Sequence, residues 1–161
     1  MDWRYVVRES DVDAGAGLIA ATGFFSAEEQ LIATELVEER LARGRASGYE
    51  FLFADDPEKD GQLLGYTCFG PIPATASSYD LYWIAVSPHA QRQGVGRRLL
   101  RETERLALQQ QATRMFVDTA GRADYALTRL FYERMGYHVE ASITDFYAPG
   151  DAKVIYARQL V

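Results

Sequence analysis

The sequence predicts a mixed α/β fold in which helices cover the faces of a central sheet. Strand-like and helix-like stretches follow one another in the order β-α-α-β-β-β-α-β-α-β-β. Two of the strand-like stretches, 49–54 and 62–70, are separated by a short polar turn and therefore predict an antiparallel hairpin. A loop with two glycines, 87–96, then connects a strand to a long helix, as in a β-α-β unit.

The N-terminal segment predicts one strand and two helices. Residues 3–8 (WRYVVR) have the composition of a strand. Residues 9–11 supply a helix N-cap, and small and apolar residues continue the helix to about residue 21, although two glycines weaken it. Ser26 and Glu29 have the spacing of a capping box for a second helix, which Gly44 ends.

The remaining elements follow in sequence after the hairpin. The stretch 79–86 (YDLYWIAV) is a strand ended by Pro88, and its loop leads into a helix that is apolar at helical spacing. The later elements are a strand at 114–119, a helix at 124–135, and two strands at 137–146 and 153–160. The total is about seven strands and about four helices, expected to form a single domain over residues 1–161.

Composition excludes several classes of protein. The net charge of -6 argues against nucleic-acid binding and leaves room for a cationic substrate. A single cysteine, Cys68, and two scattered histidines predict neither a disulfide nor a metal site. No apolar run is long enough to span a membrane and no signal peptide is recognisable, so the expected location is the cytoplasm.

The loop 91–98 (QRQGVGRR) predicts a binding site for phosphate groups. It opens a helix, where backbone N–H groups lack acceptors and the helix dipole is positive. Its glycines, Gly94 and Gly96, allow a ligand to approach the backbone. A nucleotide-binding P-loop is disfavoured because no Lys-Ser/Thr pair follows the second glycine.

Two motifs in this order resemble the GNAT superfamily, the GCN5-related N-acetyltransferases. Gln91, Gly94 and Gly96 match the motif Gln/Arg-x-x-Gly-x-Gly/Ala, and residues 130–137 (LFYERMGY) look like the family segment Leu-Tyr-Glu-x-x-Gly-Phe. The resemblance covers nearly the whole chain. It implies a sheet that splays between its fourth and fifth strands, with acetyl-CoA as the acetyl donor.

The resemblance also implies which residues hold the donor. Backbone N–H groups of the glycine loop would bind the pyrophosphate, and the backbone of the fourth strand would pair with the pantetheine arm. The side chains of Ile84 and Val86 are equally consistent with simple core packing. The expected donor-binding residues are Ile84, Ala85, Val86, Gln91, Arg92, Gln93, Gly94, Val95, Gly96, Arg97, Thr119, Tyr125 and Phe131.

Acetyl transfer to an amine needs a neutral amine, a stabilised oxyanion and a proton for the departing thiolate. Tyr132 stands at the family's tyrosine position and is the candidate general acid; packing on the sheet is the alternative. Asp80 stands where histone-acetylating members have a glutamate and is the candidate base, acting through water; a solvated aspartate at a strand start is the alternative. The backbone N–H of Val86 is the candidate oxyanion donor.

The chain departs from the family at Tyr125, where many members have an asparagine that contacts pantetheine. Thr119, Arg122 or Thr128 are possible replacements. The expected acceptor-binding residues are Phe24, Phe25, Tyr82, Asp145 and Tyr147. Tyr82 is included because strand alternation would place it on the same face as Asp80, Ile84 and Val86. For Asp145 and its neighbours an ordinary turn is the alternative.

The implied function is transfer of acetyl from acetyl-CoA to a primary amine by direct attack in a ternary complex. The alternative is an acyl-CoA-binding sensor or regulatory module with weak or no turnover. The expected acceptor is a small-molecule amine or a peptide amine. No nucleic acid, membrane or metal is expected as a partner, and exposed strand edges near the C-terminus are compatible with a homodimer.

Overall fold

The computed structural model describes residues 1–161, which form two compact units. The N-terminal unit comprises Met1–Gly70 and Trp83–Leu106, and the C-terminal unit comprises Pro71–Tyr82 and Ala107–Val161. The strands are hydrogen-bonded in the order β1 (Asp2–Arg4), β2 (Glu50–Asp55), β3 (Leu63–Pro71), β4 (Ser78–Val86), β5 (Arg114–Ala120), β7 (Asp151–Gln159) and β6 (His138–Ala148). The predicted mixed sheet of seven strands with four helices is therefore confirmed.

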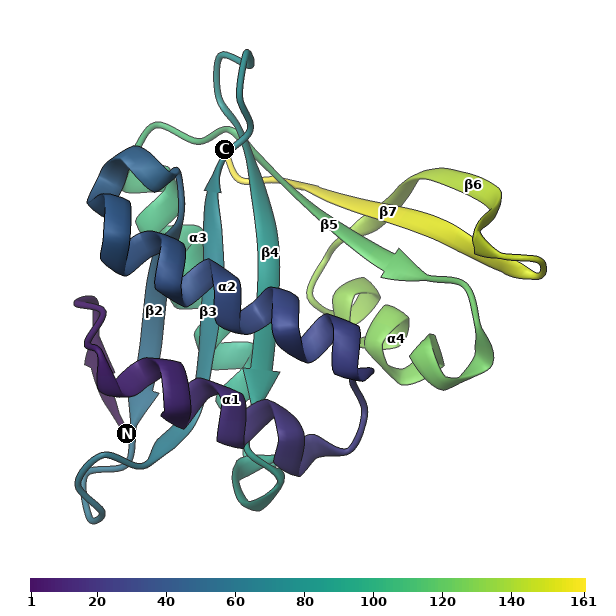
Figure 1. Ribbon diagram of the computed structural model, residues 1–161. Coiled ribbons are helices and arrows are strands. Elements are labelled where there is room, and N and C mark those ends of the chain that lie inside the picture. The colour runs from purple at the N-terminus through teal and green to yellow at the C-terminus, as the bar shows by residue number, and fades with distance from the viewer. The chain divides into compact units, whose positions relative to one another are not determined.

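Most predicted elements occur within one or two residues of their expected bounds (Figure 1). The first half of the chain contains β1 (Asp2–Arg4), α1 (Ser10–Thr22), α2 (Ala27–Arg43), β2 (Glu50–Asp55) and β3 (Leu63–Pro71). The second half contains β4 (Ser78–Val86), α3 (Val95–Gln109), β5 (Arg114–Ala120), α4 (Ala126–Arg134), β6 (His138–Ala148) and β7 (Asp151–Gln159). None of the four helices has both the length and the apolar character needed to cross a bilayer.

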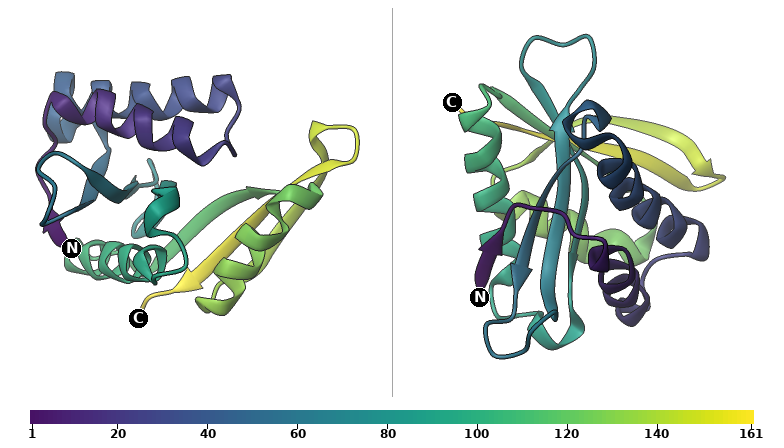
Figure 2. Two further views of the ribbon diagram at one scale, coloured as in Figure 1. Left: turned by 90° about the horizontal axis from the view of Figure 1, so that it is seen from below. Right: turned by 60° about the vertical axis from the view of Figure 1, so that its left-hand side comes forward.

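In the N-terminal unit, β2 and β3 are buried on both faces, which explains their nearly continuous apolar sequence. Helices α1 and α2 cover one face and α3 covers the other (Figure 2). On the first face, Gly15 of α1 lies against the ring of Tyr66 in β3. On the second, Leu52 of β2 packs with Leu99 of α3. Two opposed layers of side chains therefore fix the position of the hairpin.

The strand β1 is shorter than predicted, because the chain turns after Arg4. The Arg4 guanidinium donates to the carbonyl of Val6 at 2.7 Å and forms ion pairs with Asp11 at 2.8 Å and Asp55 at 2.7 Å. Asp11 is 2% exposed and also accepts the backbone N–H of Arg8. The sequence 9–11 does start a helix, but no side chain caps it at Glu9. Asp11 is instead part of the buried charge network with Arg4.

Helix α2 begins and ends as the sequence predicts. The Ser26 side chain accepts the Glu29 N–H at 3.1 Å, and the Glu29 carboxylate accepts the Ser26 N–H at 2.8 Å. Gly44 ends the helix, with φ of 58°. This reciprocal capping stabilises the helix start by satisfying two otherwise unpaired donors.

In the C-terminal unit, β4 pairs in parallel with β5, while β5–β7 and β6–β7 are antiparallel. Helix α4 covers the face that carries Val117 of β5 and Tyr156 of β7, and the Tyr156 hydroxyl donates to Glu133 of α4 at 2.8 Å. Side chains alternate between the two faces along each strand. Phe116 and Asp118 flank Val117 along β5, and Lys153 is opposite Ala120, so these three residues lie on the other face.

Candidate active site

The loop between β4 and α3 has the backbone geometry of an anion-binding turn. Arg92 and Gly94 both adopt left-handed conformations, with φ of 61° and 77°. Left-handed residues within a turn bring successive N–H groups toward one point, which creates a concavity for anions. The first hydrogen bond of α3 runs from the Arg98 N–H to the Gly94 carbonyl at 3.0 Å. The N–H groups of residues 95–97 therefore lack acceptors within the helix.

Two glutamine side chains of the loop bind the loop itself. Gln91 Nε2 donates to the Val86 carbonyl at 3.2 Å, and Gln93 Nε2 donates to the His89 carbonyl at 2.7 Å. The family-matching residue Gln91 thus ties the loop to the end of β4. These contacts explain why a side-chain amide is needed there without requiring it to touch a ligand.

The loop and the start of α3 carry cations that no carboxylate neutralises. Arg92, Arg97 and Arg98 are exposed and make no ion pair. Further along the helix the arginines are paired, Arg101 with a glutamate at 2.9 Å and Arg105 with another at 2.6 Å. Positive charge is therefore available at the helix end where the N–H groups are free.

The side chains of Ile84 and Val86 in β4 pack against the core that includes Leu99 of α3. Both side chains are half-buried, so the packing expected in the alternative is present in part. The role proposed for their backbone groups in donor binding stays a prediction.

Strand β4 contacts residues at and beyond α3 at two points. The Tyr79 hydroxyl donates to the Gln110 side chain at 3.2 Å, and Ile84 packs against the cluster that contains Leu99. That Asp80 and Tyr82 share the face of Ile84 and Val86 stays a prediction.

Asp80 is half-buried and faces a charged cluster. It pairs with Phe116 of β5, and Asp118 and Lys153 lie on the same sheet face. Burial, followed by the charge of Asp118, raises the pKa of Asp80 from 3.8 to about 6, and Lys153 partly opposes this rise. A carboxylate with a pKa near neutrality is suited to accept a proton. Asp80 is still partly solvated, as in the alternative, and its role as the base stays a prediction.

Tyr132 is 2% exposed and lies among aromatic rings. Its ring centroid is 5.6 Å from that of Tyr137 and 6.2 Å from that of Tyr156. Burial raises its pKa well above 10, so the hydroxyl stays protonated. Because Tyr156 is on the α4 face, Tyr132 and Asp80 lie on opposite faces of the sheet in the C-terminal unit. Tyr132 is therefore packed among other side chains, as in the alternative, and its role as a general acid stays a prediction.

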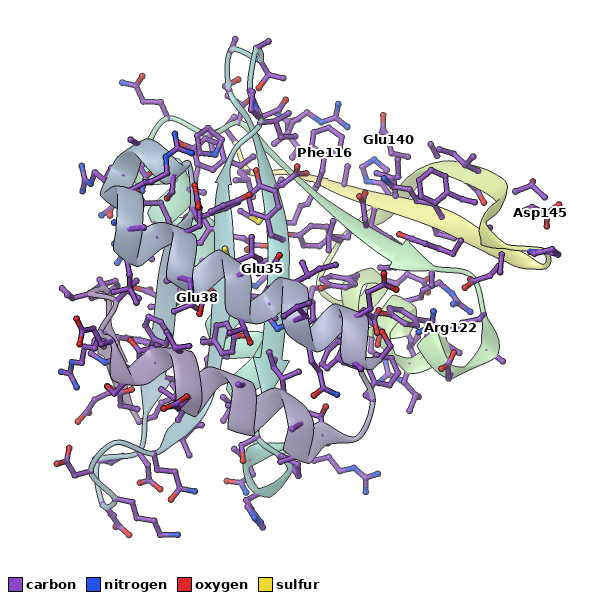
Figure 3. The ribbon with its side chains drawn as sticks, viewed as in Figure 1. Glu35, Glu38, Phe116, Arg122, Glu140 and Asp145 are labelled. Carbon is purple, nitrogen blue, oxygen red and sulfur yellow. The ribbon has the colours of Figure 1, made fainter.

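The connection between β5 and α4 is held by residues whose role the sequence did not reveal. Arg129 donates to the carbonyls of Ala120 at 2.7 Å and Arg122 at 3.0 Å. Arg122 (labelled in Figure 3) lies over the ring of Tyr125 at 4.5 Å, and its N–H donates to Asp151. Arg129 is therefore a structural clamp.

Thr119 uses its hydroxyl inside the sheet. It is 3% exposed and donates to the Val154 carbonyl at 2.9 Å. The Thr119 hydroxyl hydrogen is therefore already used within the sheet and does not offer the contact of the family asparagine. Phe131, also expected near the donor, stacks edge-on against Tyr132 at 5.2 Å.

An aromatic cluster lies where α1 meets α2. The rings of Phe24 and Phe25 are 5.1 Å apart, and Phe25 lies 4.7 Å from Trp83 of β4. The Trp83 indole Nε1 is buried and has no hydrogen-bond acceptor. The two phenylalanines were expected from sequence, whereas Trp83 looked like an ordinary strand residue.

The turn between β6 and β7 contains one of the expected acceptor-binding residues. Asp145 lies near the tip of this hairpin (Figure 3), with φ of 52°, and its Oδ1 accepts the Gly150 N–H at 2.7 Å. The carboxylate thus closes the turn, as in the alternative, and its role toward an acceptor stays a prediction. Phe146 and Tyr147, about half exposed, form an edge-on pair at 5.0 Å. No cluster of three or more His, Cys, Asp or Glu side chains is arranged to hold a metal ion.

Comparison with known proteins defines the class to which this fold belongs. The profile of the acetyltransferase (GNAT) domain matches residues 47–139. A GNAT-family protein from Desulfovibrio desulfuricans is 42% identical, with a TM-score of 0.93 over 99% of both chains. The fold and the loop are those of an acetyltransferase domain.

The chain belongs to the GNAT acetyltransferase family. The fold is also shared with more distant enzymes. An aminoglycoside 6'-N-acetyltransferase in complex with coenzyme A is 15% identical, with a TM-score of 0.77, covering 100% of this chain and 98% of its own. The ribosomal-protein-S18-alanine N-acetyltransferase from Escherichia coli is 18% identical, with a TM-score of 0.73, covering 99% and 93% respectively. A search of curated protein sequences found no match.

Proposed function

We propose that the chain is an N-acetyltransferase that transfers the acetyl group of acetyl-CoA to a primary amine. The observation that carries the proposal is the loop at the start of α3, with left-handed residues at Arg92 and Gly94 and free arginines beside it. Family membership and the coenzyme A bound to a structural neighbour support the choice of donor. The match to a GNAT-family protein over 99% of the chain supports a single N-acetyltransferase domain over residues 1–161.

In this proposal the loop binds the pyrophosphate through the backbone N–H groups of residues 92–97. Arg92 and Arg97 supply positive charge, and the backbone of β4 at residues 84–86 pairs with the pantetheine arm. The N–H of Val86 donates to the carbonyl oxygen as negative charge develops on it. A fit of this kind requires exposed backbone, which the loop has, since residues 91–94 are exposed.

Asp80 accepts the proton that the amine loses. The amine nitrogen forms a bond to the thioester carbon, the carbon–sulfur bond breaks, and the proton passes to the carboxylate directly or through one water. Because the pKa of Asp80 is about 6, the group is ionised at neutral pH and remains a useful base.

Tyr132 donates a hydrogen bond to the departing thiolate. Its raised pKa keeps the proton on its oxygen, whereas a free thiol has a pKa of about 8.5. Complete proton transfer from Tyr132 is therefore unfavourable, and stabilisation of the sulfur by a hydrogen bond is the part of the acid role that burial favours. The thiolate then takes its proton from solvent, and Asp80 returns to solvent the proton that it took from the amine.

The acceptor class we propose is a primary amine on a small molecule or a peptide, contacted by Phe24, Phe25 and the ring of Tyr147. Two structural neighbours are named for N-acetylation, one of an aminoglycoside and one of an alanine of ribosomal protein S18. Aromatic side chains suit the apolar body of such a molecule.

A panel of primary amines tests the function. The chain is incubated with acetyl-CoA and each amine in turn, and free thiol is measured with a chromogenic reagent. We expect thiol release that depends on the amine, with the acetylated product confirmed by mass spectrometry. Binding of acetyl-CoA without turnover on any amine would favour a sensor module and contradict the enzymatic proposal.

The variant Tyr132→Phe separates the hydroxyl from the ring. With the best amine we expect kcat to fall about 10- to 100-fold, the effect of losing a hydrogen bond to a charged group, while the free energy of unfolding stays close to wild type. An unchanged kcat would remove Tyr132 from the reaction and leave the enzymatic assignment intact.

A further inference from the structure

The face of the C-terminal sheet that carries Asp80 also carries a charge pair. Lys153 Nζ lies 2.8 Å from Asp118 Oδ2, and the two side chains are 21% and 49% exposed. Lys153 Nζ also lies 4.9 Å from the centroid of the Phe146 ring. The lysine is therefore held on two sides, by a carboxylate on β5 and by an aromatic ring beside the β6–β7 turn.

Strand register places this pair next to Asp80. Asp80 is opposite Phe116, and Asp118 is the next residue of β5 on the same face. From strand spacing and rise, their Cα atoms are about 8 Å apart, so the carboxylates are within reach of one another. Lys153 is opposite Ala120, one further step along that face. The cluster has two carboxylates and one ammonium.

Other charges on this face are already neutralised. Arg114, opposite Ser78, pairs with Glu140 at 2.8 Å and lies over the Phe116 ring at 4.7 Å. The electrostatic partners of Asp80 are Asp118 and Lys153, and Tyr147 contributes to the raised pKa of Lys153. The charge state of Asp80 therefore depends mainly on one neighbouring pair.

We propose that Lys153 and Asp118 are positioning residues that set the pH at which Asp80 becomes available as a base. The inference rests on the proposed function, in which Asp80 takes the proton of the amine. A lone carboxylate partner would keep Asp80 protonated at neutral pH, and a lone ammonium would make it too weak a base. The paired arrangement holds its proton affinity between these limits.

Two substitutions should shift the pKa of Asp80 in opposite directions. Lys153→Met leaves two carboxylates without a cation, which raises the pKa of Asp80. Asp118→Asn leaves the ammonium without its carboxylate, which lowers it. Because a charge at this separation shifts a carboxyl pKa by about one unit, we expect shifts of that order. Lys153→Arg keeps the charge and should restore the wild-type value.

The titration is followed directly by carbon NMR of protein labelled with ¹³C at the aspartate carboxyls. The Asp80 signal is assigned by its loss in Asp80→Asn. Lys59→Met, the same change at an exposed lysine in the β2–β3 turn, is the matched control and should leave the Asp80 midpoint unchanged. Movement of the midpoint upward in Lys153→Met and downward in Asp118→Asn supports the proposal. Equal midpoints in both variants, or movement in one direction, overturn it.

The acidic limb of kcat/KM for an amine acceptor, measured on the same variants, tests the link to catalysis. We expect it to move with the NMR midpoint. NMR midpoints that move while the limb stays fixed would overturn the role in catalysis and leave the electrostatic coupling standing. Absence of thiol release from wild-type chain is a separate failure, that of the proposed function itself.

Discussion

Asp80 illustrates how one strand residue acquires a chemical role from its surroundings. An aspartate near the start of a strand is ordinarily solvated and ionised above pH 4. Here half-burial and the neighbouring Asp118 both oppose ionisation, and the pKa rises to about 6. The family resemblance identified the position of Asp80. The neighbouring charges of Asp118 and Lys153 could not be found from sequence, because these residues lie on β5 and β7, far along the chain.

The raised pKa of Asp80 makes a prediction about stability. A folded-state pKa above the unfolded value means that the folded chain holds this proton more tightly, so stability falls as pH rises from about 4 to about 6. Asp80→Asn removes this cost. We expect the variant to match wild type at pH 4 and to be more stable by about 1 kcal/mol at pH 7.5, a value reduced for partial exposure.

Urea unfolding at the two pH values measures this difference. Asp60→Asn, an exposed aspartate in the β2–β3 turn, is the control and should show no such dependence on pH. A benefit of Asp80→Asn that is the same at pH 4 and pH 7.5 would contradict the raised pKa.

The remaining site residues show what the sequence can and cannot reveal. Local patterns identified the loop residues Gln91 and Gly94, because the turn they form depends on their own backbone and amide groups. For Asp145 the sequence allows an acceptor contact or an ordinary turn, and the structure shows that its carboxylate closes the turn. Trp83 and Arg129 were missed, because their partners are set by tertiary contacts.

At the scale of elements, local signals were reliable where the cause is local. The reciprocal Ser26–Glu29 cap fixed the start of α2. The strand β1 ended early because Arg4 binds carboxylates on α1 and β2, which no local pattern reports.

The start of α3 is the element on which donor binding depends. Gly94 has φ of 77°, and a Cβ at this position would meet nothing within 4 Å. Gly94→Ala therefore introduces backbone strain of about 1 kcal/mol and a methyl group where we place the pyrophosphate. We expect the KM for acetyl-CoA to rise about tenfold or more, which corresponds to about 1.4 kcal/mol.

Gly48→Ala is the matched control, because Gly48 has φ of 78° and the same open surroundings in the connection before β2. It should lose a similar amount of stability and keep the wild-type KM. Equal KM values in the two variants would show that the loop does not hold the donor.

At the scale of the whole molecule, the order of elements was the most predictable property. Each strand and helix has its own apolar pattern, and the glycine loop identifies the β-α-β connection. The family assignment follows from the combination of this order with two short motifs. Side-chain roles in catalysis depend on distances between strands that the order alone does not define.

A ligand that binds the folded chain must also stabilise it as a whole. At a free concentration 100 times the Kd, acetyl-CoA should add about 2.7 kcal/mol to the free energy of unfolding. For a chain of 161 residues this raises Tm by about 5–10 °C. We expect a thermal-shift titration with acetyl-CoA to show this rise in wild type and in Gly48→Ala, with a much smaller rise at the same concentration in Gly94→Ala.

ATP, which offers a triphosphate without pantetheine, is the comparison ligand and should give the weaker response, since the pantetheine contacts with β4 are absent. A wild-type Tm that does not change at millimolar acetyl-CoA would exclude both an acetyltransferase and a CoA-binding sensor.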